Sequence, residues 1–531
     1  MKKCLALLLT LGLLCGLLAS CRTQPPALET ADRWVDGGEP ATIKILTERF
    51  MWSDSPDMVL ANKASHLLGS LGRIIDYFEH EHPNVTVEVE YVTISPSTRE
   101  TEMQARRVAL MGGDVPDLYL MPTMSSEIFY QGRDMENGEY PFVFRDPAQA
   151  MTNGWFADVA PYYNGDEELH TEGLVSGVME AGMLDNQRLI LPLGYDMDLM
   201  FLDKKEREAS HLDQKALGNY GSTVNHVLEL DDLRWVTGLS VFGQQLNLLP
   251  ALCDYQKEKL LLKQEDAVQF LKDSRRLSDG ISEYYQDYFD RHPDVQSIGA
   301  PYLFSYLGGE KKDAFSPELP AIGLPLRQAV DVLAICKAQG FETEILPLRD
   351  VDGKLSANIT YWGAVSSGSK NIPLAYEFLR LFLTPEVQWG GTLTCQDGTT
   401  FKTGFLDRMY ESEDLYITPG WPVRSQGAVE ARWEKIYQEA KRYERNALVI
   451  ADKAPPYITD LLAVEVTEED LPFLAEGVDR ARFPSVVDLW FDRLSSTVLY
   501  PGLEAQPLTD QEIAAKTEEF LRELRYHLAE G

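Results

Sequence analysis

The sequence predicts an α/β fold of more than one domain, carried behind an N-terminal export segment. Three observations lead to this prediction: the length of 531 residues, a strand–helix alternation after residue 40, and an apolar run at the N-terminus. A chain of this length exceeds what one simple hydrophobic core normally serves, so two or more domains are expected. Hydrophobic content of 44% and aromatic content of 10% indicate well-packed globular domains.

The first twenty residues are predicted to be a secretory signal peptide. Lys2 and Lys3 precede an almost uninterrupted apolar run that reaches Ala19, which is the pattern of such a peptide. The run ends in Leu-Ala-Ser-Cys at Cys21, which resembles the lipobox of bacterial lipoproteins, in which this cysteine sulfur is diacylated. We therefore expect residues 1–20 to be removed and residues 21–40, with several Pro and Gly, to form a flexible stalk. No later stretch approaches the ~18 apolar residues needed to span a bilayer.

The order of segments after residue 40 indicates the type of α/β fold. Apolar residues alternate as in a strand at 42–46, recur at helical spacing over 67–78, and alternate again at 85–91. A polar helix is expected at 101–111 and a short apolar strand at 118–121. This is the doubly wound pattern, in which ligands bind beyond the carboxyl ends of the strands. At the other end of the chain, a capping box at Thr509 to Glu512 predicts a final helix.

Charge and cysteine content exclude several kinds of partner and site. The formal net charge is −34, and such a surface repels nucleic acid and anionic lipid. Beyond Cys21, the chain has only Cys253, Cys336 and Cys395, widely spaced and without a C-x-x-C pair. This pattern is neither a disulfide framework nor a zinc site, and one disulfide and buried free thiols stay equally open.

Seven passages along the chain share an order with one protein family. They lie at 78–85, 109–117, 158–162, 191–204, 361–370, 375–388 and 419–424. The second is similar to an A-x-x-G-x-x-P-D turn and the third to a D-L-T-P-Y segment. Together they resemble the family 1 extracellular solute-binding proteins of ABC importers, the maltose-binding-protein-like group.

The resemblance implies a two-lobed, type II periplasmic-binding-protein-like fold, with two doubly wound lobes joined by crossover strands. Lobe one would comprise residues 41–198 plus 363–410, and lobe two residues 199–362 plus 411–531. Residues 206–276 show no clear counterpart in the family pattern. The implied function is capture of a solute, expected to be an oligosaccharide, by a monomer that is lipid-anchored at the extracytoplasmic face of the bacterial cell membrane. It would deliver the solute to an ABC permease without a cofactor and without catalysis.

Candidate ligand-binding residues lie at strand ends and in the crossovers. Sugar sites pair flat aromatic faces with groups that hydrogen-bond hydroxyls. The residues of this kind are Arg49, Trp52, Thr123, Met124, Tyr195, Asp196, Asp198, Tyr302, Trp362, Trp421 and Trp490. Trp362, between Tyr361 and Gly363, is expected to have little core to join and therefore to contact ligand. Trp490 follows Pro484 by six residues, as a ligand-stacking tryptophan does in the family. Asp196 and Asp198 share one face of a strand, so either that pair or Tyr195 is expected to face the ligand. The two negative charges keep a polyamine as an alternative solute.

Several motifs suggest other chemistry and are interpreted structurally. Ser367 to Lys370 fits S-x-x-K and Lys402 to Gly404 fits K-T-G, but no S-D-N lies between them. His80 and His82 form an H-x-H pair with no third ligand nearby in sequence, which favours a surface turn over a metal site. Asp350 to Gly353 is expected to be a hairpin turn. No phosphate-binding glycine motif occurs, so ATP hydrolysis would belong to another subunit.

Two alternative functions share these features. An exported glycoside hydrolase needs two carboxylates roughly 5–10 Å apart, which 83 acidic residues leave possible. A sugar receptor without transport would share the fold.

Overall fold

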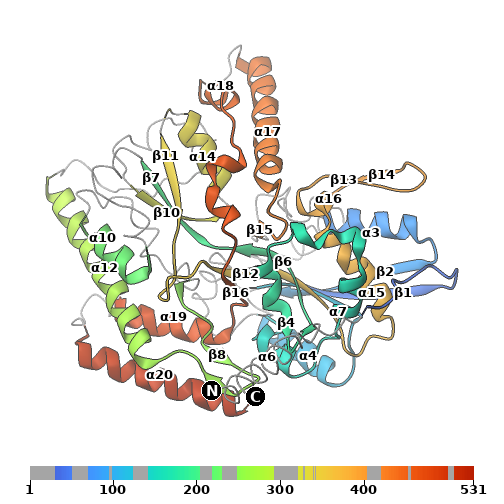
Figure 1. Cartoon of the computed structure of the whole chain (residues 1–531), viewed down its shortest axis with the longest axis horizontal. Helices are drawn as coiled ribbons and strands as arrows, with labels where there is room; N and C mark the ends of the chain where they lie inside the picture. Colours follow the sequence, from blue (N-terminus) through green and yellow to red (C-terminus); the bar gives the residue numbers. More distant parts are fainter. Residues whose placement is uncertain are drawn as a thin grey trace, which may run out of the picture.

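The computed structural model describes residues 30–50, 70–94, 99–123, 142–203, 218–229, 248–291, 321–326, 329–338, 340, 342–403, 420–451, 456–499 and 508–530. The described chain forms two α/β lobes side by side (Figure 1). The first lobe is built on a seven-stranded sheet, and the second lobe contains a three-stranded sheet. The mixed α/β fold expected from the sequence is confirmed.

The sheet of the first lobe has the strand order β15-β6-β12-β3-β1-β2, with β16 beside β12. Its strands are β1 (Ala41–Phe50), β2 (Val85–Ile94), β3 (Leu118–Pro122), β6 (Leu191–Asp196), β12 (Ser356–Val365), β15 (Trp421–Pro422) and β16 (Arg480–Arg482). β1 is parallel to both β2 and β3, whereas β12 is antiparallel to β3 and β6. The parallel order β2-β1-β3 confirms the doubly wound start.

The two helices that connect these parallel strands follow the predicted periodicity. In α3 (Ser70–Glu81), Leu71, Ile74 and Phe78 are buried against the sheet, as residues three and four apart on one helix face should be. α4 (Arg99–Met111) ends shortly before Gly113, whose φ of +91° is the left-handed conformation that favours glycine.

Shorter elements complete the first lobe. The helices are α6 (Pro147–Thr152), α7 (Ala160–Gly165), α8 (Ser176–Met179), α15 (Ile372–Arg380) and α16 (Pro385–Gln388). Two hairpins join β4 (Met183–Leu184) to β5 (Gln187–Arg188) and β13 (Thr392–Thr394) to β14 (Thr400–Lys402). Asp166, directly after α7, forms a buried ion pair with Arg380 of α15 and also accepts a hydrogen bond from the Tyr376 hydroxyl. These contacts hold α15 beside α7.

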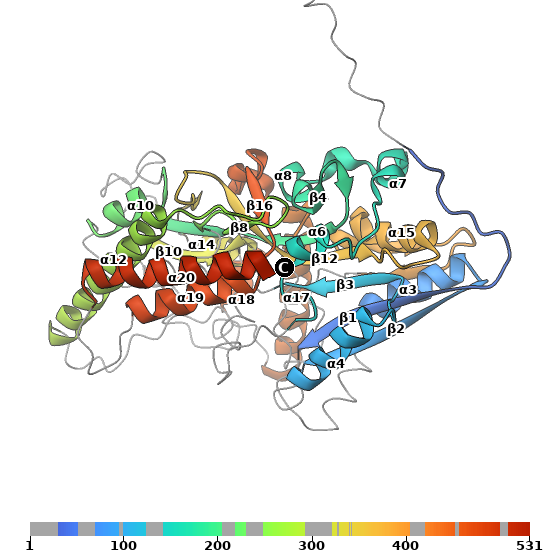
Figure 2. The same ribbon diagram turned by 90° about the horizontal axis from the view of Figure 1, so that it is seen from below.

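The second lobe is built around a three-stranded sheet with the strand order β10-β7-β11. β7 (Asp198–Asp203) is antiparallel to β10 (Ala321–Pro325) and to β11 (Thr343–Pro347). The remaining elements are α10 (Tyr220–Val227), β8 (Cys253–Asp254), β9 (Lys259–Leu260), α12 (Gln264–Arg291), α14 (Ala329–Ala338), α17 (Ala428–Ala451), α18 (Pro456–Leu462), α19 (Val486–Leu499) and α20 (Asp510–Glu530). α12, α19 and α20 pack against one another along one side of the lobe (Figure 2).

The C-terminal helix begins as the sequence predicted. Glu512 accepts a hydrogen bond from the Thr509 backbone at 2.7 Å, and the Thr509 hydroxyl accepts from the Glu512 backbone at 3.3 Å. Ile513, Phe520, Leu524 and other apolar residues of this helix are buried. The capping box and the apolar face of α20 are therefore confirmed.

The chain passes between the sheets at strand ends. β6 ends at Asp196 in the large sheet and β7 begins at Asp198 in the small one, within the first predicted crossover. The second passage lies between β11 and β12. Residues 361–370, predicted as that crossover, lie instead within and directly after β12, which belongs to the large sheet along its whole length. The predicted division at 362/363 therefore falls inside one strand.

Asp350 to Gly353 form a structural turn before β12, but the expected hairpin is wrong, because β11 and β12 belong to different sheets. Both Asp352 and Lys354 donate backbone hydrogen bonds to Asp350 Oδ1, at 2.9 and 3.0 Å, and the Arg480 guanidinium binds the other oxygen. Gly353 has a φ of +76° in this turn.

Cys253, Cys336 and Cys395 are free and buried, which decides between the two alternatives that the sequence left for these thiols. Within the described ranges, no helix combines the length and the apolar content needed to cross a bilayer.

Candidate functional site

Four predicted site residues lie in or directly after strands β15, β6 and β3 of the large sheet. Tyr195 on β6 is paired with Trp421 on β15, and Asp196 follows at the end of β6. The Thr123 backbone, directly after β3, donates to the Thr360 carbonyl of β12 at 2.9 Å. The side chains of all four predicted residues are buried. The fold thus brings Thr123, Tyr195, Asp196 and Trp421 to one region of the sheet but leaves their side chains little exposed surface.

The two acidic residues of the first crossover do not act as a pair on one face. Asp196 is the last residue of β6 and Asp198 is the first of β7, so the two belong to different sheets. Asp196 Oδ1 accepts a hydrogen bond from the Met197 backbone at 3.0 Å. The alternation on which the shared-face prediction depended is interrupted by the change of sheet.

Trp362 has a different environment from the one expected. Only 1% of the residue is exposed. Its ring lies 5.8, 5.5 and 6.3 Å from the rings of Phe144, Phe156 and Phe483. The expectation that this tryptophan has little core to join is wrong, because β12 is an interior strand that is buried at every position. Its indole N–H has no hydrogen-bond partner among the described residues.

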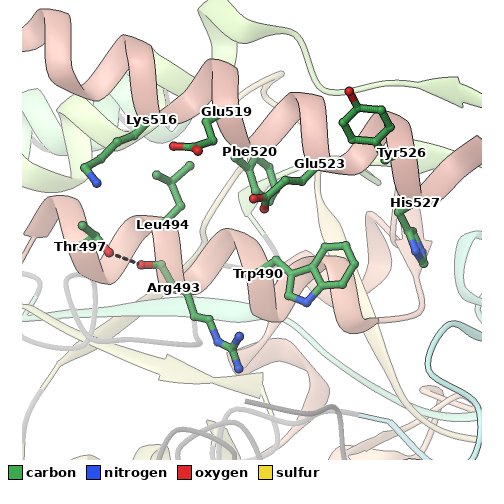
Figure 3. A pocket seen from close by; sticks show the side chains of 10 residues that line it. All are labelled: Trp490, Arg493, Leu494, Thr497, Lys516, Glu519, Phe520, Glu523, Tyr526 and His527. Carbon is green, nitrogen blue, oxygen red and sulfur yellow. Dashed lines mark hydrogen bonds between the residues drawn. The ribbon is translucent and has the colours of Figure 1, made fainter. Parts of the chain in front are cut away.

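Trp490 lines a cavity of about 540 Å³ between α19 and α20 (Figure 3). We call this cavity the α19–α20 pocket. Its lining consists of Trp490, Arg493, Leu494, Thr497, Lys516, Glu519, Phe520, Glu523, Tyr526 and His527. The volume falls within the range of small-molecule sites.

Helical spacing explains why these side chains meet. The α19 residues at 490, 493, 494 and 497 and the α20 residues at 516, 519, 520, 523, 526 and 527 recur three and four apart, so each set occupies one face of its helix. Because α19 and α20 pack together, the two faces border a common space. In Figure 3 the Trp490 indole lies below Glu523 and beside His527.

The pocket combines aromatic surface with charges of both signs. The ring of Trp490 meets the ring of His527 edge-on at 5.1 Å, and Tyr526 is 63% exposed. Arg493 and Lys516 supply cationic donors, and Glu519 and Glu523 supply carboxylate acceptors. Flat aromatic faces beside such donors and acceptors suit a ligand that has both C–H patches and hydroxyl groups.

One side of the pocket reaches the junction of the lobes. His527 Nε2 lies 3.4 Å from the Tyr255 hydroxyl, and that hydroxyl donates a hydrogen bond to Asp146. Tyr255 follows β8 in the second lobe, whereas Asp146 caps α6 in the first. Burial raises the pKa of Asp146 to about 6, against the opposing effect of the hydrogen bonds from Tyr255 and the Gln149 backbone.

The sequence named Trp490 as a ligand-binding candidate, but none of its neighbours in the pocket. The available signal was the three- and four-residue spacing of charged and aromatic residues on the last two helices. The side chain of Arg49, whose backbone is in β1, and the residues Trp52, Met124 and Tyr302 lie outside the described side chains, as does Cys21. Their predicted roles stay predictions.

A second cavity of about 480 Å³ lies between α20 and the segment that joins β9 to α12. Lys259, Lys263 and Arg525 contribute to its lining.

No protein family model and no curated protein sequence matches this chain. Among solved structures, it is similar to the galacto-N-biose/lacto-N-biose I-binding protein of an ABC transporter from Bifidobacterium longum, at 12% identity and a TM-score of 0.45. That likeness covers 93% of this chain and 99% of the other. It is also similar to a family 1 extracellular solute-binding protein from Alicyclobacillus acidocaldarius, at 13% identity, a TM-score of 0.42, and coverage of 92% and 99%.

A third similar structure is the sugar-binding protein MalE from Xanthomonas citri, at 10% identity and a TM-score of 0.41, covering 92% of this chain and 98% of the other. These proteins are of the kind that the order of sequence motifs resembles. At such identities and TM-scores, neither a ligand nor the role of any residue transfers from them to this chain.

Proposed function

We propose that this chain is an extracellular solute-binding protein that captures an oligosaccharide for the permease of an ABC importer. The observation that supports the proposal most is the composition of the α19–α20 pocket. Its lining includes the indole of Trp490, the exposed ring of Tyr526, and two cationic and two anionic side chains. An aromatic face covers the apolar C–H patch of a pyranose, while charged groups hydrogen-bond its hydroxyls.

The pocket lies between two helices of the second lobe, and His527 connects it to the lobe junction. His527 contacts both Trp490 within the pocket and Tyr255 at the lobe junction. A solute that moves His527 would therefore change the contact of His527 with the Tyr255 hydroxyl, which donates a hydrogen bond to Asp146. Closure of lobes around a ligand is a common response in binding proteins of this architecture.

Two alternatives make different demands on the same pocket. A glycoside hydrolase needs two carboxylates across a sugar, and Glu519 and Glu523 keep this alternative open. A polyamine would bind these carboxylates but would repel Arg493 and Lys516, which is why an oligosaccharide is favoured.

The ligand is tested by thermal shift with a panel of neutral, amino and acidic di- and trisaccharides and a polyamine. Binding of the native state at 100 times Kd adds about 2.7 kcal/mol of stability, which gives a measurable rise in melting temperature. The best saccharide is then incubated with the protein and recovered by chromatography. Intact saccharide supports capture. Cleavage beyond the molar amount of protein would establish the hydrolase instead, and a panel without any shift would contradict saccharide binding.

We also propose that the protein acts as a monomer that lipid on Cys21 anchors at the extracytoplasmic face of the cell membrane. The C21A variant should leave the detergent-extractable membrane fraction or keep its signal peptide. C15A, a cysteine within the signal run, is the matched control and should stay anchored. Lipidated, membrane-bound C21A protein would refute the anchor. Co-purification of the lipidated protein with permease subunits distinguishes an importer component from a receptor without transport.

A further inference from the structure

His80, Cys395 and Asp397 form a cluster of metal-ligand types on the first lobe. One ligand atom from each residue lies within 4.8 Å of the other two. His80 is the penultimate residue of α3, and its Nε2 atom is 2.9 Å from Asp397 Oδ2. Cys395 and Asp397 belong to the turn between β13 and β14, more than 300 positions later in the chain. No sequence pattern connects these residues, and only the fold brings them together.

The turn is held in the shape that presents both residues to α3. The Cys395 backbone donates to the Thr399 carbonyl at 2.7 Å, and the Gly398 backbone donates to the Cys395 carbonyl at 2.9 Å. Asp397 Oδ1 accepts from the Thr399 backbone at 2.8 Å, which leaves the other carboxylate oxygen toward His80. Gly398 has a φ of +86°, a conformation that fits glycine and makes the tight turn possible.

The hairpin is also docked on α3 without any ion. The Phe401 ring lies 6.2 Å from Tyr77 and 5.8 Å from His80. Glu81 accepts a hydrogen bond from the Gln396 backbone at 3.0 Å. Because α3 and the hairpin already contact each other, an ion would bind a largely preformed site.

We propose that His80, Cys395 and Asp397 bind a divalent transition-metal ion of the zinc class. Imidazole nitrogen, thiolate sulfur and carboxylate oxygen are the ligands that zinc uses. Calcium and magnesium take oxygen ligands, so a set with a thiol and an imidazole selects against them. Tetrahedral zinc, with bonds of about 2.0 to 2.3 Å, needs ligand atoms roughly 3.3 to 3.8 Å apart, which small side-chain rotations reach from the observed spacing.

Glu81 is a neighbour of the cluster, but the ligand atoms within 4.8 Å of one another come from His80, Cys395 and Asp397. A water would fill the fourth position of a tetrahedral zinc ion at this site. Burial and the neighbouring Glu81 and Asp397 carboxylates raise the pKa of the Cys395 thiol to about 11. A bound cation replaces the proton on that sulfur and neutralises the surrounding carboxylates. The ion would fasten the β13–β14 hairpin to α3. This site is independent of the α19–α20 pocket and of any sugar.

Cobalt(II) is the probe, because a cobalt–thiolate bond gives a charge-transfer absorption that other ligands do not. The full chain is titrated with Co²⁺ and then with Zn²⁺. We expect one Co²⁺ per chain, the charge-transfer band, and its loss when Zn²⁺ displaces the cobalt. C395S should abolish the band, and H80Q and D397N should weaken metal binding about tenfold or more. The parent and all three variants keep Cys253 and Cys336, so a band that is lost in C395S comes from the Cys395 thiolate.

H82Q is the matched control. His82 follows two residues after His80, but its ring packs on Trp34 and Phe78 at 5.1 and 4.6 Å. This variant should bind Co²⁺ like the parent. A circular dichroism melt confirms that each variant is folded. The proposal is overturned if the parent shows no thiolate band, if the band survives in C395S, or if H82Q weakens binding as much as H80Q does.

Discussion

The Tyr255 hydroxyl donates a hydrogen bond to the Asp146 carboxylate across the junction of the two lobes. Asp146 also accepts from the Gln149 backbone at 3.1 Å, where it caps α6. On the other side of Tyr255, His527 lies between the hydroxyl and the ring of Trp490. A side chain of the candidate pocket is therefore two contacts away from a buried carboxylate of the other lobe.

Tyr255→Phe should destabilise the protein more at pH 8 than at pH 4. Asp146 has a folded-state pKa of about 6 against 3.8 in the unfolded chain, so it is ionised in both states at pH 8. At that pH the hydroxyl stabilises a buried charge, and its loss should cost about 1.5–3 kcal/mol. Near pH 4 the folded protein holds a neutral carboxyl group, and the cost should be smaller. Chemical denaturation at the two pH values measures the difference.

Tyr526→Phe is the control for that comparison, because its ring is 63% exposed and its hydroxyl can bond water. It should change stability by no more than about 0.5 kcal/mol at either pH. An equal loss for Tyr255→Phe at pH 4 and pH 8 would show that the hydroxyl does not stabilise the charged form of Asp146.

Trp362→Ala should lower stability by about 3–5 kcal/mol, as expected when a large aromatic residue is removed from a core. Its ring contacts Phe144, Phe156 and Phe483, so truncation leaves a cavity between β12 and the segments that cover it. Trp490→Ala removes the same side chain from a partly buried position and should cost less. Melting temperatures of both variants test this order. A Trp362→Ala protein that melts like the parent would contradict the core assignment.

The parent should lose stability as pH rises from about 4.5 to 8. Glu48→Gln should remove this pH-dependent loss. Burial raises the pKa of Glu48 to about 8, and only the Val143 backbone, at 2.7 Å, is described as donating to its carboxyl group. Over this range the unfolded chain releases the Glu48 proton while the folded protein retains it, so stability falls with rising pH. Above pH 8 glutamine keeps the acceptor without the charge.

The expected gain for Glu48→Gln at pH 9 is up to about 4 kcal/mol, with little gain at pH 5. Denaturation curves of parent and variant at the two pH values measure it. A gain of the same size at both values would mean that the pKa of Glu48 is not raised.

Local patterns were sufficient to predict the start and the end of the fold. The strands and helices from β1 to β3 and the capped helix α20 depend on alternation, helical periodicity and a capping box, which are properties of neighbouring residues. The second crossover was misplaced because β12 is buried on both faces. A strand of this kind has no alternating pattern to show where it begins or which sheet it joins.

The sites depended on long-range packing and were harder to predict. Trp490 was a candidate from the sequence, but Lys516, Glu519 and Glu523 line the same pocket only because α19 and α20 pack side by side. His80 and His82 had no third metal ligand nearby in sequence, whereas the fold brings Cys395, from more than 300 residues later in the chain, next to His80. Trp362 was misjudged because its neighbours in the chain do not reveal the three phenylalanines around it.

Titration calorimetry of the best saccharide into the parent, Trp490→Ala and Trp433→Ala tests the central claim most directly. Trp433 is a buried tryptophan on α17 and controls for loss of an indole elsewhere. The parent should give a saturable heat for one site per chain. Trp490→Ala should bind about ten- to a hundredfold more weakly, or about 1–3 kcal/mol, and Trp433→Ala should bind like the parent. Equal affinity in Trp490→Ala, or a heat signal that continues after each injection as substrate is consumed, would contradict capture of a sugar at this pocket.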